Sequence, residues 1–210
     1  MTKALILAAG RSIRFGGDKR QAQLPSGRTV LAATVERYLE CFESVVVVLR
    51  PGEEPSSLLP NPISIRASFA HPPASELGLG DSIAAGVGAC SGAESVCIAL
   101  ADMPWVRLET LERLRAAWGA IENRRGAVLQ PIRNNRPGHP VFFDRALFGE
   151  LESLRGDQGA ASVRTHASSR MLVETEDDGV FRDIDMRSDL KAGNSSDSSH
   201  IECKSAPSSS

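Results

Sequence analysis

The apolar run from Val45 to Leu49 constrains the fold of this chain more than any other segment. Four of its five residues are valines, whose β-branched side chains favour strands, and none is polar. A strand without a polar face must be buried on both sides, which is typical of parallel sheets covered by helices on both faces. This segment therefore predicts an α/β fold.

The rest of residues 1–191 alternates between helical and strand-like patterns, as such a fold requires. Helical spacing of apolar residues predicts helices over residues 29–39, 81–90, 108–121 and 146–154. Short apolar runs predict further strands at residues 4–8, 63–65, 96–101, 128–129, 141–143, 171–173 and 180–184. We expect a doubly wound, mostly parallel α/β sheet with helices on both faces, and ligands outside the carboxyl ends of its strands.

The composition is that of one globular domain: 210 residues, of which 41% are hydrophobic and 24% charged. A net charge of -2 argues against a nucleic-acid partner, and no apolar run approaches the roughly 20 residues of a membrane span. We therefore expect a cytoplasmic protein that binds neither nucleic acid nor membrane. Residues 192–210 contain eight serines without apolar periodicity, which predicts a disordered tail after a domain of residues 1–191.

The first 30 residues are basic, although the chain as a whole is slightly acidic. They hold six lysines and arginines against one acid, Asp18, which makes a local net charge of +5. Most of these cations lie in the loop after the first predicted strand, together with Gly10, Gly16 and Gly17. Glycines let backbone N–H groups approach a ligand closely, and the cations supply opposite charge. The loop is therefore predicted to bind a polyphosphate.

Two common phosphate-binding motifs are absent from this sequence. Gly10 and Gly16 are one residue too far apart for a P-loop, and Arg20 follows Lys19 where Ser or Thr is required. Gly78-Leu79-Gly80 begins a dinucleotide fingerprint, but Ile83 stands at the position of its third glycine. The sequence supports neither a kinase-like ATPase nor a dehydrogenase.

The loop residues follow the pattern L-A-A-G-x-S-x-R-x-G-x-x-K, which resembles the first motif of nucleotidyltransferases that activate small molecules with nucleoside triphosphates. The resemblance extends in motif order over residues 4–190 and is strongest to the branch that contains molybdenum cofactor cytidylyltransferase. It implies a Rossmann-like domain that transfers CMP from CTP to the phosphate of molybdopterin and releases pyrophosphate. It also implies that Arg14 and Lys19 are catalytic and that the nucleotide is bound by Leu7, Ala8, Ala9, Gly10, Arg11 and Ser12.

The same resemblance bears on the choice of base. Cytidylyltransferases of this family read L-A-A-G, as here, whereas guanylyltransferases read L-A-G-G. The Cβ of Ala9 would crowd a purine more than a pyrimidine, so we expect CTP to be the substrate.

Asp102 directly follows the apolar run of residues 96–101, at the carboxyl end of a predicted strand. A carboxylate placed there suits Mg²⁺, which takes one or two carboxylates and phosphate oxygens, although Asp102 could equally cap the next helix. The string Leu100-Ala101-Asp102-Met103-Pro104 resembles the family's metal-binding motif. The resemblance thus implies Mg²⁺ on Asp102.

A second carboxylate pair, Asp183 and Asp185, lies near the end of the domain. Two residues apart in a strand, these side chains would share a face. The pair resembles the family's D-I-D-T-P-E-D-L element, but Met186, Arg187 and Ser188 replace its Thr-Pro-Glu. We expect Asp185 to be the second metal ligand, with Asp183 as the alternative; a capping role for either also stays open.

Three further segments resemble substrate-binding elements of this family. The loop around Gly78 implies that Gly80 and Ser82 lie near the nucleotide, although a plain helix cap would read the same. The Gly-His-Pro segment implies that His139 contacts the pterin. In the G-D-x-G-A-R element Ala161 replaces the arginine, and Arg164, one helical turn on, is our candidate to substitute for it.

The implied acceptor is a phosphate monoester, which is anionic at neutral pH and needs no general base. Two alternatives stay open. One is a nucleotidyltransferase that acts on a sugar phosphate or another phosphorylated small molecule. The other is a non-catalytic molybdenum cofactor chaperone that serves a molybdoenzyme or its accessory protein. Release of pyrophosphate with Mg²⁺ and a suitable acceptor separates these readings.

Overall fold

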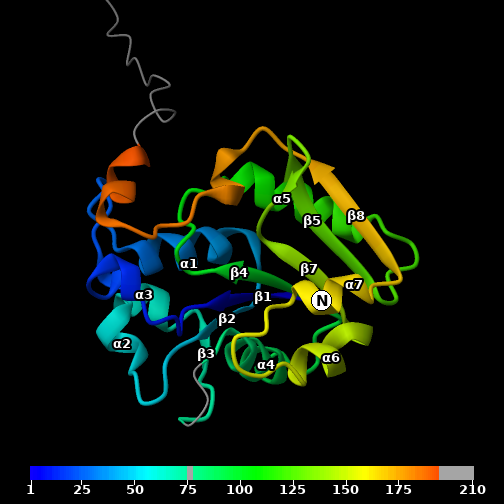
Figure 1. The fold of residues 1–210 in the computed structure, drawn as a ribbon, viewed down its shortest axis with the longest axis horizontal. Helices are drawn as coiled ribbons and strands as arrows, with labels where there is room; N and C mark the ends of the chain where they lie inside the picture. The colour runs from blue at the N-terminus through cyan, green and yellow to red at the C-terminus, as the bar shows by residue number, and fades with distance from the viewer. Residues whose placement is uncertain (75–77, 194–210) are drawn as a thin grey trace, which may run out of the picture.

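A computed structural model describes residues 1–74 and 78–193, and an eight-stranded sheet forms the centre of this part of the chain (Figure 1). The strand order is β3-β2-β1-β4-β7-β5-β6, and β8 pairs with β5. Parallel pairing joins β3 (Ser68–Ala70), β2 (Val45–Val48), β1 (Thr2–Leu7) and β4 (Ser95–Leu100). Beyond them, β7 (Val141–Asp144) is antiparallel to β4 and β5 (Ala127–Arg133), β6 (Arg136–Pro137) is antiparallel to β5, and β8 (Ser169–Glu174) is parallel to β5.

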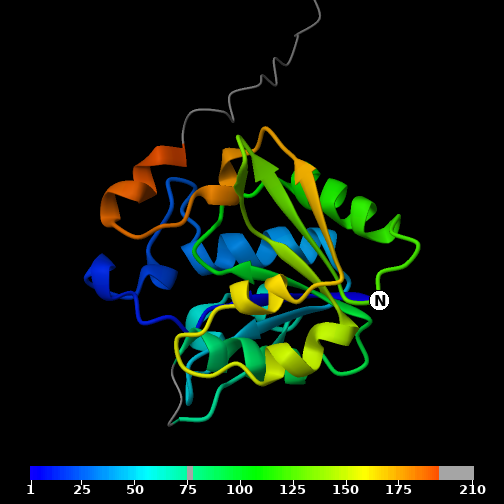
Figure 2. The same ribbon diagram turned by 45° about the vertical axis from the view of Figure 1, so that its right-hand side comes forward.

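Helices cover both faces of the sheet (Figure 2). One face carries α1 (Val30–Cys41) and α5 (Leu108–Gly119), and the other carries α4 (Leu79–Ala89), α6 (Phe148–Glu152) and α7 (Ala161–Thr165). Strand β1 alternates between them: Ala4 and Ile6 join the first core, and Leu5 and Leu7 join the second. The buried, fully apolar strands are thus explained by two separate cores.

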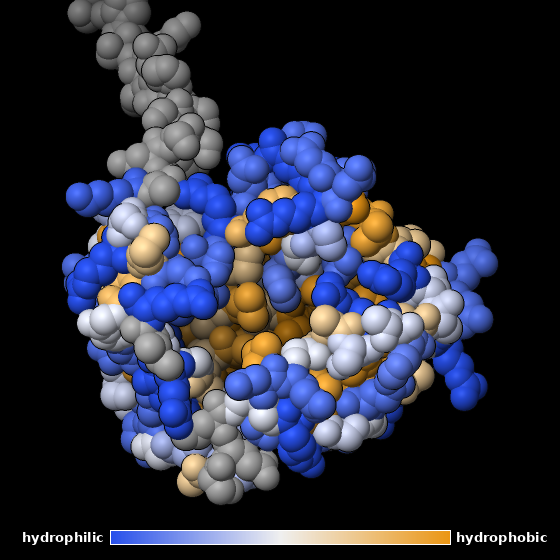
Figure 3. All heavy atoms as spheres, in the orientation of Figure 1, coloured by the Kyte–Doolittle hydropathy of each residue, from blue (hydrophilic) through white to orange (hydrophobic). Residues whose placement is uncertain are grey.

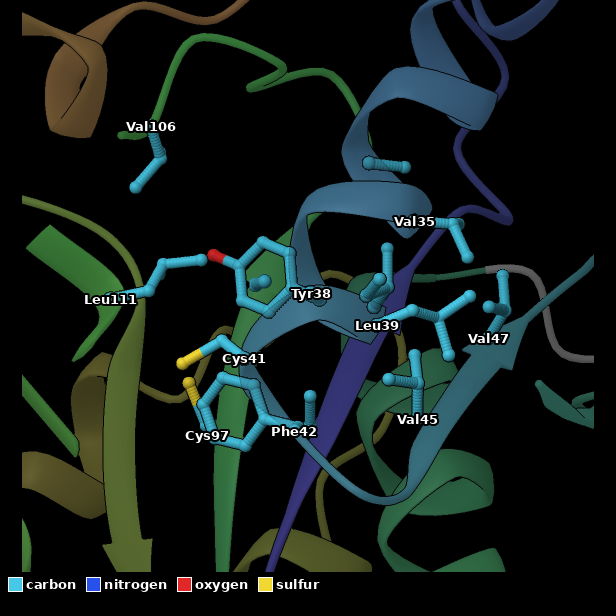
Figure 4. Packing of buried hydrophobic residues seen from close by; sticks show 14 of the residues in the cluster. Val35, Tyr38, Leu39, Cys41, Phe42, Val45, Val47, Cys97, Val106 and Leu111 are labelled. Atoms are coloured by element: carbon cyan, nitrogen blue, oxygen red, sulfur yellow. The ribbon is translucent and has the colours of Figure 1, made fainter. Parts of the chain in front are cut away.

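The core on the α1 and α5 side is closed by aromatic packing near the end of α1 (Figure 4). The rings of Tyr38 and Phe42 stack with their centroids 5.9 Å apart, and the rings of Phe142 and Trp118 lie 5.6 Å apart. Cys97 of β4 is fully buried beside them. Cys41, Cys90 and Cys97 are buried free thiols, and Cys203 lies outside the described residues.

The mostly parallel, doubly wound sheet agrees with the sequence-based expectation, but two predicted strands are wrong. Residues 63–65 belong to a turn of helix, α3 (Asn61–Ser64), and the strand lies later, at β3. Proline at the first turn favours this helix, and Ile65 is 78% exposed although the strand pattern would bury it together with Ile63. A second short helix, α2 (Pro55–Leu58), precedes it.

Residues 180–184 do not form a strand either. A 3₁₀-helix spans Asp178–Phe181, and the chain continues without regular structure to residue 186. The cause is local: the Asp177 side chain accepts hydrogen bonds from the backbone N–H groups of Gly179 and Arg107. This cap begins a turn where the apolar run predicted a strand.

Nothing in the structure tests the boundary predicted at residue 191, since residues 194–210 lie outside the described part. A 3₁₀-helix, Arg187–Gly193, ends the described chain. None of the described helices has the length and apolarity that a membrane crossing demands.

Candidate active site

The carboxyl ends of β1, β2 and β4 lie in register, with Leu7 beside both Val48 and Leu100. The loops that leave these strands therefore start from the same edge of the sheet. They bring together the predicted phosphate-binding loop, which follows β1, and Asp102, which follows β4.

The loop after β1 points its carbonyl groups inward and leaves its N–H groups unused. Arg20 donates to the carbonyl of Ala8 at 2.9 Å, and Arg50 donates to those of Ala9 and Gly10. The N–H groups of residues 9–12 donate no hydrogen bond within residues 1–74 and 78–193. Successive free N–H groups on a turn form a concavity suited to an anion.

Arg20 is only 3% exposed, and its partners explain how a cation can lie there. It bonds the carboxylates of Asp18 and Glu53, each at 2.5 Å at the closest. Burial opposes its charge, but Glu53 and Asp18 outweigh this effect and raise the pKa of Arg20. Arg20 therefore stabilises the conformation of the loop. Its place in a basic segment had suggested a cation available to a phosphate, and the structure shows that it is not available.

Lys19 lies between the two predicted metal ligands. Its ammonium is 2.6 Å from Asp102 and 3.3 Å from Asp185. Burial acts to lower the pKa of Lys19, but the two carboxylates raise it above its ordinary value. Burial raises the pKa of Asp102, and Lys19 offsets this effect only in part. The structure thus brings together three residues that are far apart in the sequence.

Asp185 reaches this position because its neighbour Ile184 is fully buried, in a small core with Phe15 of the loop. The N–H of Ile184 donates to the carbonyl of Asp102 at 3.0 Å, which ties the two segments together. Asp183 is exposed, and the strand that was predicted to place it on one face with Asp185 does not form. Of the two, Asp185 is the residue that reaches Lys19.

Sequence reasoning missed Asp189, which shapes this turn. Its carboxylate accepts from the N–H groups of Asp185 at 2.9 Å and Met186 at 2.7 Å. This arrangement replaces the Thr-Pro turn of the resembling family. The signal available in the sequence was an acidic residue three or four positions after the residues whose N–H groups it accepts from.

The donor set is compatible with a divalent cation. One oxygen of Asp102, Oδ1, is buried and has no hydrogen-bond partner among the described residues. Two carboxylates that converge on one cationic atom, beside a loop with free backbone N–H groups, match the ligands that Mg²⁺ prefers. No group of three or more acidic, His or Cys residues that could hold a metal occurs in the described chain.

Three adjoining cavities form a trench along this edge of the sheet, and Figure 3 shows a hollow on this face with an apolar floor and a hydrophilic rim. The first, of about 240 Å³, is lined by Arg11, Ser12, Arg14, Phe15, Lys19 and Asp185. The second, of about 350 Å³, is lined by Leu7, Ala9, Gly10, Arg11, Gly78, Leu79, Ser82, Leu100, Asp102 and Asp157. Shared lining residues connect the cavities: Arg11 joins the first two, and Leu7 joins the second to the third.

The third cavity, of about 210 Å³, has mainly apolar walls, and His139 and Arg164 are its basic residues. Burial, with Arg164 nearby, lowers the pKa of His139 to about 4, so the imidazole is neutral at pH 7. Its Nδ1 is buried without a partner in the described chain. Residues 161–165 are helical, as they must be if Arg164 is to stand in for the family's arginine at position 161. Arg164 and Ala161 both line the cavity. Gln130, missed from the sequence, holds the Arg164 guanidinium at 2.5 Å.

Two predicted nucleotide-binding residues do not line any of these cavities. Ala8 faces the opposite core, and Gly80 packs against residues 155–158. A Cβ on Gly80 would lie 2.8 Å from the backbone of Arg155, and its N–H donates to Gly156 at 2.7 Å. The absence of a side chain on Gly80 lets the first turn of α4 approach residues 155–158 closely. Ser82, by contrast, lines the second cavity.

Comparison with known proteins agrees with this geometry. Residues 4–171 match the family model described as the MobA-like NTP transferase domain. The nicotine blue oxidoreductase of Paenarthrobacter nicotinovorans is 29% identical over 187 residues, which cover 86% of this chain and 90% of that protein. The purine catabolism protein PucB of Bacillus subtilis (strain 168) is 27% identical over 194 residues, with the same coverage.

A solved structure with the same fold is the molybdopterin-guanine dinucleotide biosynthesis protein A from Archaeoglobus fulgidus. It is 23% identical, has a TM-score of 0.64, and the match covers 91% of this chain and 96% of that one. The family match spans most of the chain and includes the phosphate-binding loop and Asp102. The chain therefore belongs to the MobA-like NTP transferase family.

Proposed function

We propose that this protein is a Mg²⁺-dependent cytidylyltransferase that transfers CMP from CTP to the phosphate of molybdopterin or molybdenum cofactor. The observation that carries the proposal is the trench itself. At one end lie free backbone N–H groups with Lys19, Asp102 and Asp185; at the other lies a mainly apolar cavity with a neutral histidine and a cation. A nucleotide and a flat heterocyclic acceptor need these two environments side by side.

The loop after β1 is suited to the triphosphate. The N–H groups of residues 9–12 would bind the β- and γ-phosphates, and Arg11 and Arg14 line the adjoining cavity. Arg14 is 82% exposed at its side chain, so it is free to move onto a phosphate. Ala9 lines the second cavity, where its methyl group would favour a pyrimidine over a purine.

The third cavity is suited to the acceptor. Nδ1 of the neutral imidazole of His139, which has no partner in the described chain, would form one hydrogen bond with the edge of a pterin, and the apolar walls suit the faces of the ring. Arg164 would contact the acceptor's phosphate in place of the arginine that Ala161 lacks. PucB and the archaeal protein carry names that refer to purine and molybdopterin chemistry, which supports a heterocyclic substrate.

In the proposed reaction, an oxygen of the acceptor phosphate attacks the α-phosphorus of CTP. The new P–O bond forms as the bond between the α-phosphorus and its bridging oxygen breaks, and pyrophosphate leaves. Arg14 and Lys19 stabilise the charge that develops on the α-phosphate and on the leaving group. Asp102 and Asp185 would hold Mg²⁺, which would supply charge neutralisation when bound.

The test is release of pyrophosphate with Mg²⁺ and molybdenum cofactor, with CTP, GTP, ATP and UTP compared. Strong preference for CTP is expected, and the Asp102→Asn variant should lose this activity. Preference for GTP would overturn the choice of base. Release with a sugar phosphate, but not with the cofactor, would overturn the acceptor.

Two further outcomes would replace the proposal. Binding of the cofactor without pyrophosphate release from any nucleotide would favour a chaperone that delivers it to a molybdoenzyme. Reduction of a heteroaromatic dye with NADH or NADPH, again without pyrophosphate, would favour the oxidoreductase activity named for the relative from Paenarthrobacter nicotinovorans.

A further inference from the structure

We propose that two copies of this chain form a symmetric dimer by pairing their β8 strands edge to edge. The twofold axis would pass through Leu172, and the two sheets would become one continuous sheet. The proposal rests on the exposure of β8, the direction of its backbone groups and the order of its side chains. It is independent of the activity proposed above.

Strand β8 is an unprotected edge of the sheet (Figure 1). Among the described residues it pairs with β5 alone. Five of its six residues are exposed, and the sixth, Val173, is half-buried. Met171 and Leu172 are 38% and 48% exposed, although large apolar side chains are seldom left so open on adjacent positions. Exposed edges of this kind pair readily with another strand.

The backbone groups of Arg170, Leu172 and Glu174 point away from β5. In the parallel register of β5 and β8, the N–H of Thr175 donates to Ile132 at 3.0 Å. Alternation along a strand then directs the odd-numbered residues toward β5 and the even-numbered residues outward. The other side of β5 agrees, because Pro131 accepts from Gly138, away from β8.

An antiparallel partner must therefore place even-numbered residues opposite even-numbered residues. With Leu172 opposite Leu172 of the second copy, Arg170 of each copy lies opposite Glu174 of the other. All three side chains lie on the same face of the strand. The axis thus carries an apolar pair flanked by two opposite-charge pairs, which is self-complementary as an isologous interface requires.

Neighbouring registers lack this match. A shift of two residues in one direction sets Arg170 opposite Leu172, and a shift in the other sets Glu174 opposite Leu172. Each leaves the charges without a partner across the interface. The sequence of β8 therefore selects one register, and a second copy is the partner that its charge pattern fits.

The test is the mass of the purified chain by analytical ultracentrifugation across a dilution series. We expect a concentration-dependent dimer. Arg170→Glu would set like charges opposite each other twice, so the dissociation constant should rise by about tenfold or more. The double variant Arg170→Glu with Glu174→Arg restores both pairs and should recover the dimer. Arg37→Glu, the same charge change on α1, is the matched control and should leave the dimer unchanged.

Cross-linking tests the register. Facing residues on the twofold axis have Cα atoms about 5.5 Å apart, within the range of a disulfide. Leu172→Cys should therefore form a covalent dimer under mild oxidation, whereas Ile65→Cys, which is more exposed but remote from β8, should not. Faster cross-linking by Met171→Cys than by Leu172→Cys would overturn the register. A chain that stays monomeric at every concentration, or a dimer indifferent to Arg170→Glu, would overturn the interface.

Discussion

Arg14 and Arg20 lie in one short segment, yet the structure gives them opposite roles. The Arg14 side chain is 82% exposed, and Asp185, at 3.3 Å, is its ion-pair partner. Arg20 is buried among two carboxylates and a carbonyl. An exposed cation contributes little to folding and is available to a ligand, whereas a buried one is part of the folded framework. Substitutions at these two sites should therefore separate activity from stability.

Replacing Arg14 by alanine should reduce kcat/KM by roughly 100- to 1000-fold, because a charge that stabilises the transition state is lost. The free energy of unfolding should change by less than about 0.5 kcal/mol, as is usual for an exposed side chain. Steady-state pyrophosphate release and urea unfolding measure the two quantities. Full activity in this variant would remove Arg14 from the mechanism.

Replacing Arg20 by methionine should lower the free energy of unfolding by about 1.5 to 3 kcal/mol, because the half-buried carboxylates of Asp18 and Glu53 would lose its charged hydrogen bonds and keep only Arg50 as a partner. The matched control is Arg28→Met, which removes an arginine 59% exposed at its side chain from its ion pair with Glu36. We expect that control to cost less than about 1 kcal/mol. Equal losses in urea unfolding would contradict the framework role of Arg20.

His139 should make the stability of the protein depend on pH. Its pKa is lowered to about 4 in the folded chain by burial and by Arg164, from an ordinary value of 6.5. Between these values the unfolded chain binds more protons, so the free energy of unfolding should fall as the pH is lowered from about 6.5 toward 4. The glutamine of His139→Gln cannot bind this proton, so the free energy of unfolding of that variant should depend less on pH over the same range. An unchanged profile in denaturant titrations would count against a buried neutral histidine.

At the scale of the elements, the packing of α4 on the sheet places Gly78 and Leu79 beside the trench. Two glycines that are two residues apart, on opposite sides of the helix, show how close this packing is. A Cβ on Gly86 would lie 2.5 Å from the Leu5 side chain and 2.8 Å from that of Val48. A Cβ on Gly88 would have no atom within 4 Å.

The two glycines should therefore respond in opposite directions to alanine. Gly88→Ala should stabilise the protein by about 0.5 to 1 kcal/mol, because alanine restricts the unfolded chain and favours the helix. Gly86→Ala should destabilise it by about 1 to 3 kcal/mol, because the core has no space for the methyl group. Thermal unfolding of both variants compares them directly. Stabilisation by Gly86→Ala would mean that α4 can move away from the sheet at little cost.

At the scale of the whole molecule, the trench joins segments from both ends of the described chain. The loop after β1, the end of β4 and the turn at Asp185 close one site, so a ligand that binds there stabilises the complete fold. Because two carboxylates meet at this point, binding of a nucleoside triphosphate should require a divalent cation.

We expect CTP with Mg²⁺, at about 100 times its Kd, to stabilise the protein by roughly 2.7 kcal/mol. For a chain of this size the shift in Tm should be about 5 to 10 °C. Chelation of the metal with EDTA should abolish most of the shift, as should Asp102→Asn. An equal shift with EDTA in differential scanning fluorimetry would contradict a metal-dependent nucleotide site.

Local patterns were enough for much of this molecule. The apolar strands, the amphipathic helices and the glycine-rich basic loop are readable one segment at a time, because each depends on side-chain period and on the residues next to it. The errors at residues 63–65 and 180–184 have the same origin: a proline at a helix start and the Asp177 cap decide those segments, and apolar character alone does not reveal them.

The amino-acid sequence by itself determined the α/β class, and it predicted a phosphate-binding loop after β1 and a shared site for Asp102 and Asp185. Only the tertiary structure decided which charges are free: Arg20 is paired with Asp18 and Glu53, whereas the N–H groups of residues 9–12 donate to no group in the described part of the chain. It also decided that Asp185, and not Asp183, meets Lys19, since burial of Ile184 orients that turn. The reason is physical: the charge available at a site depends on its partners in space, and those partners lie up to 171 positions away in the chain.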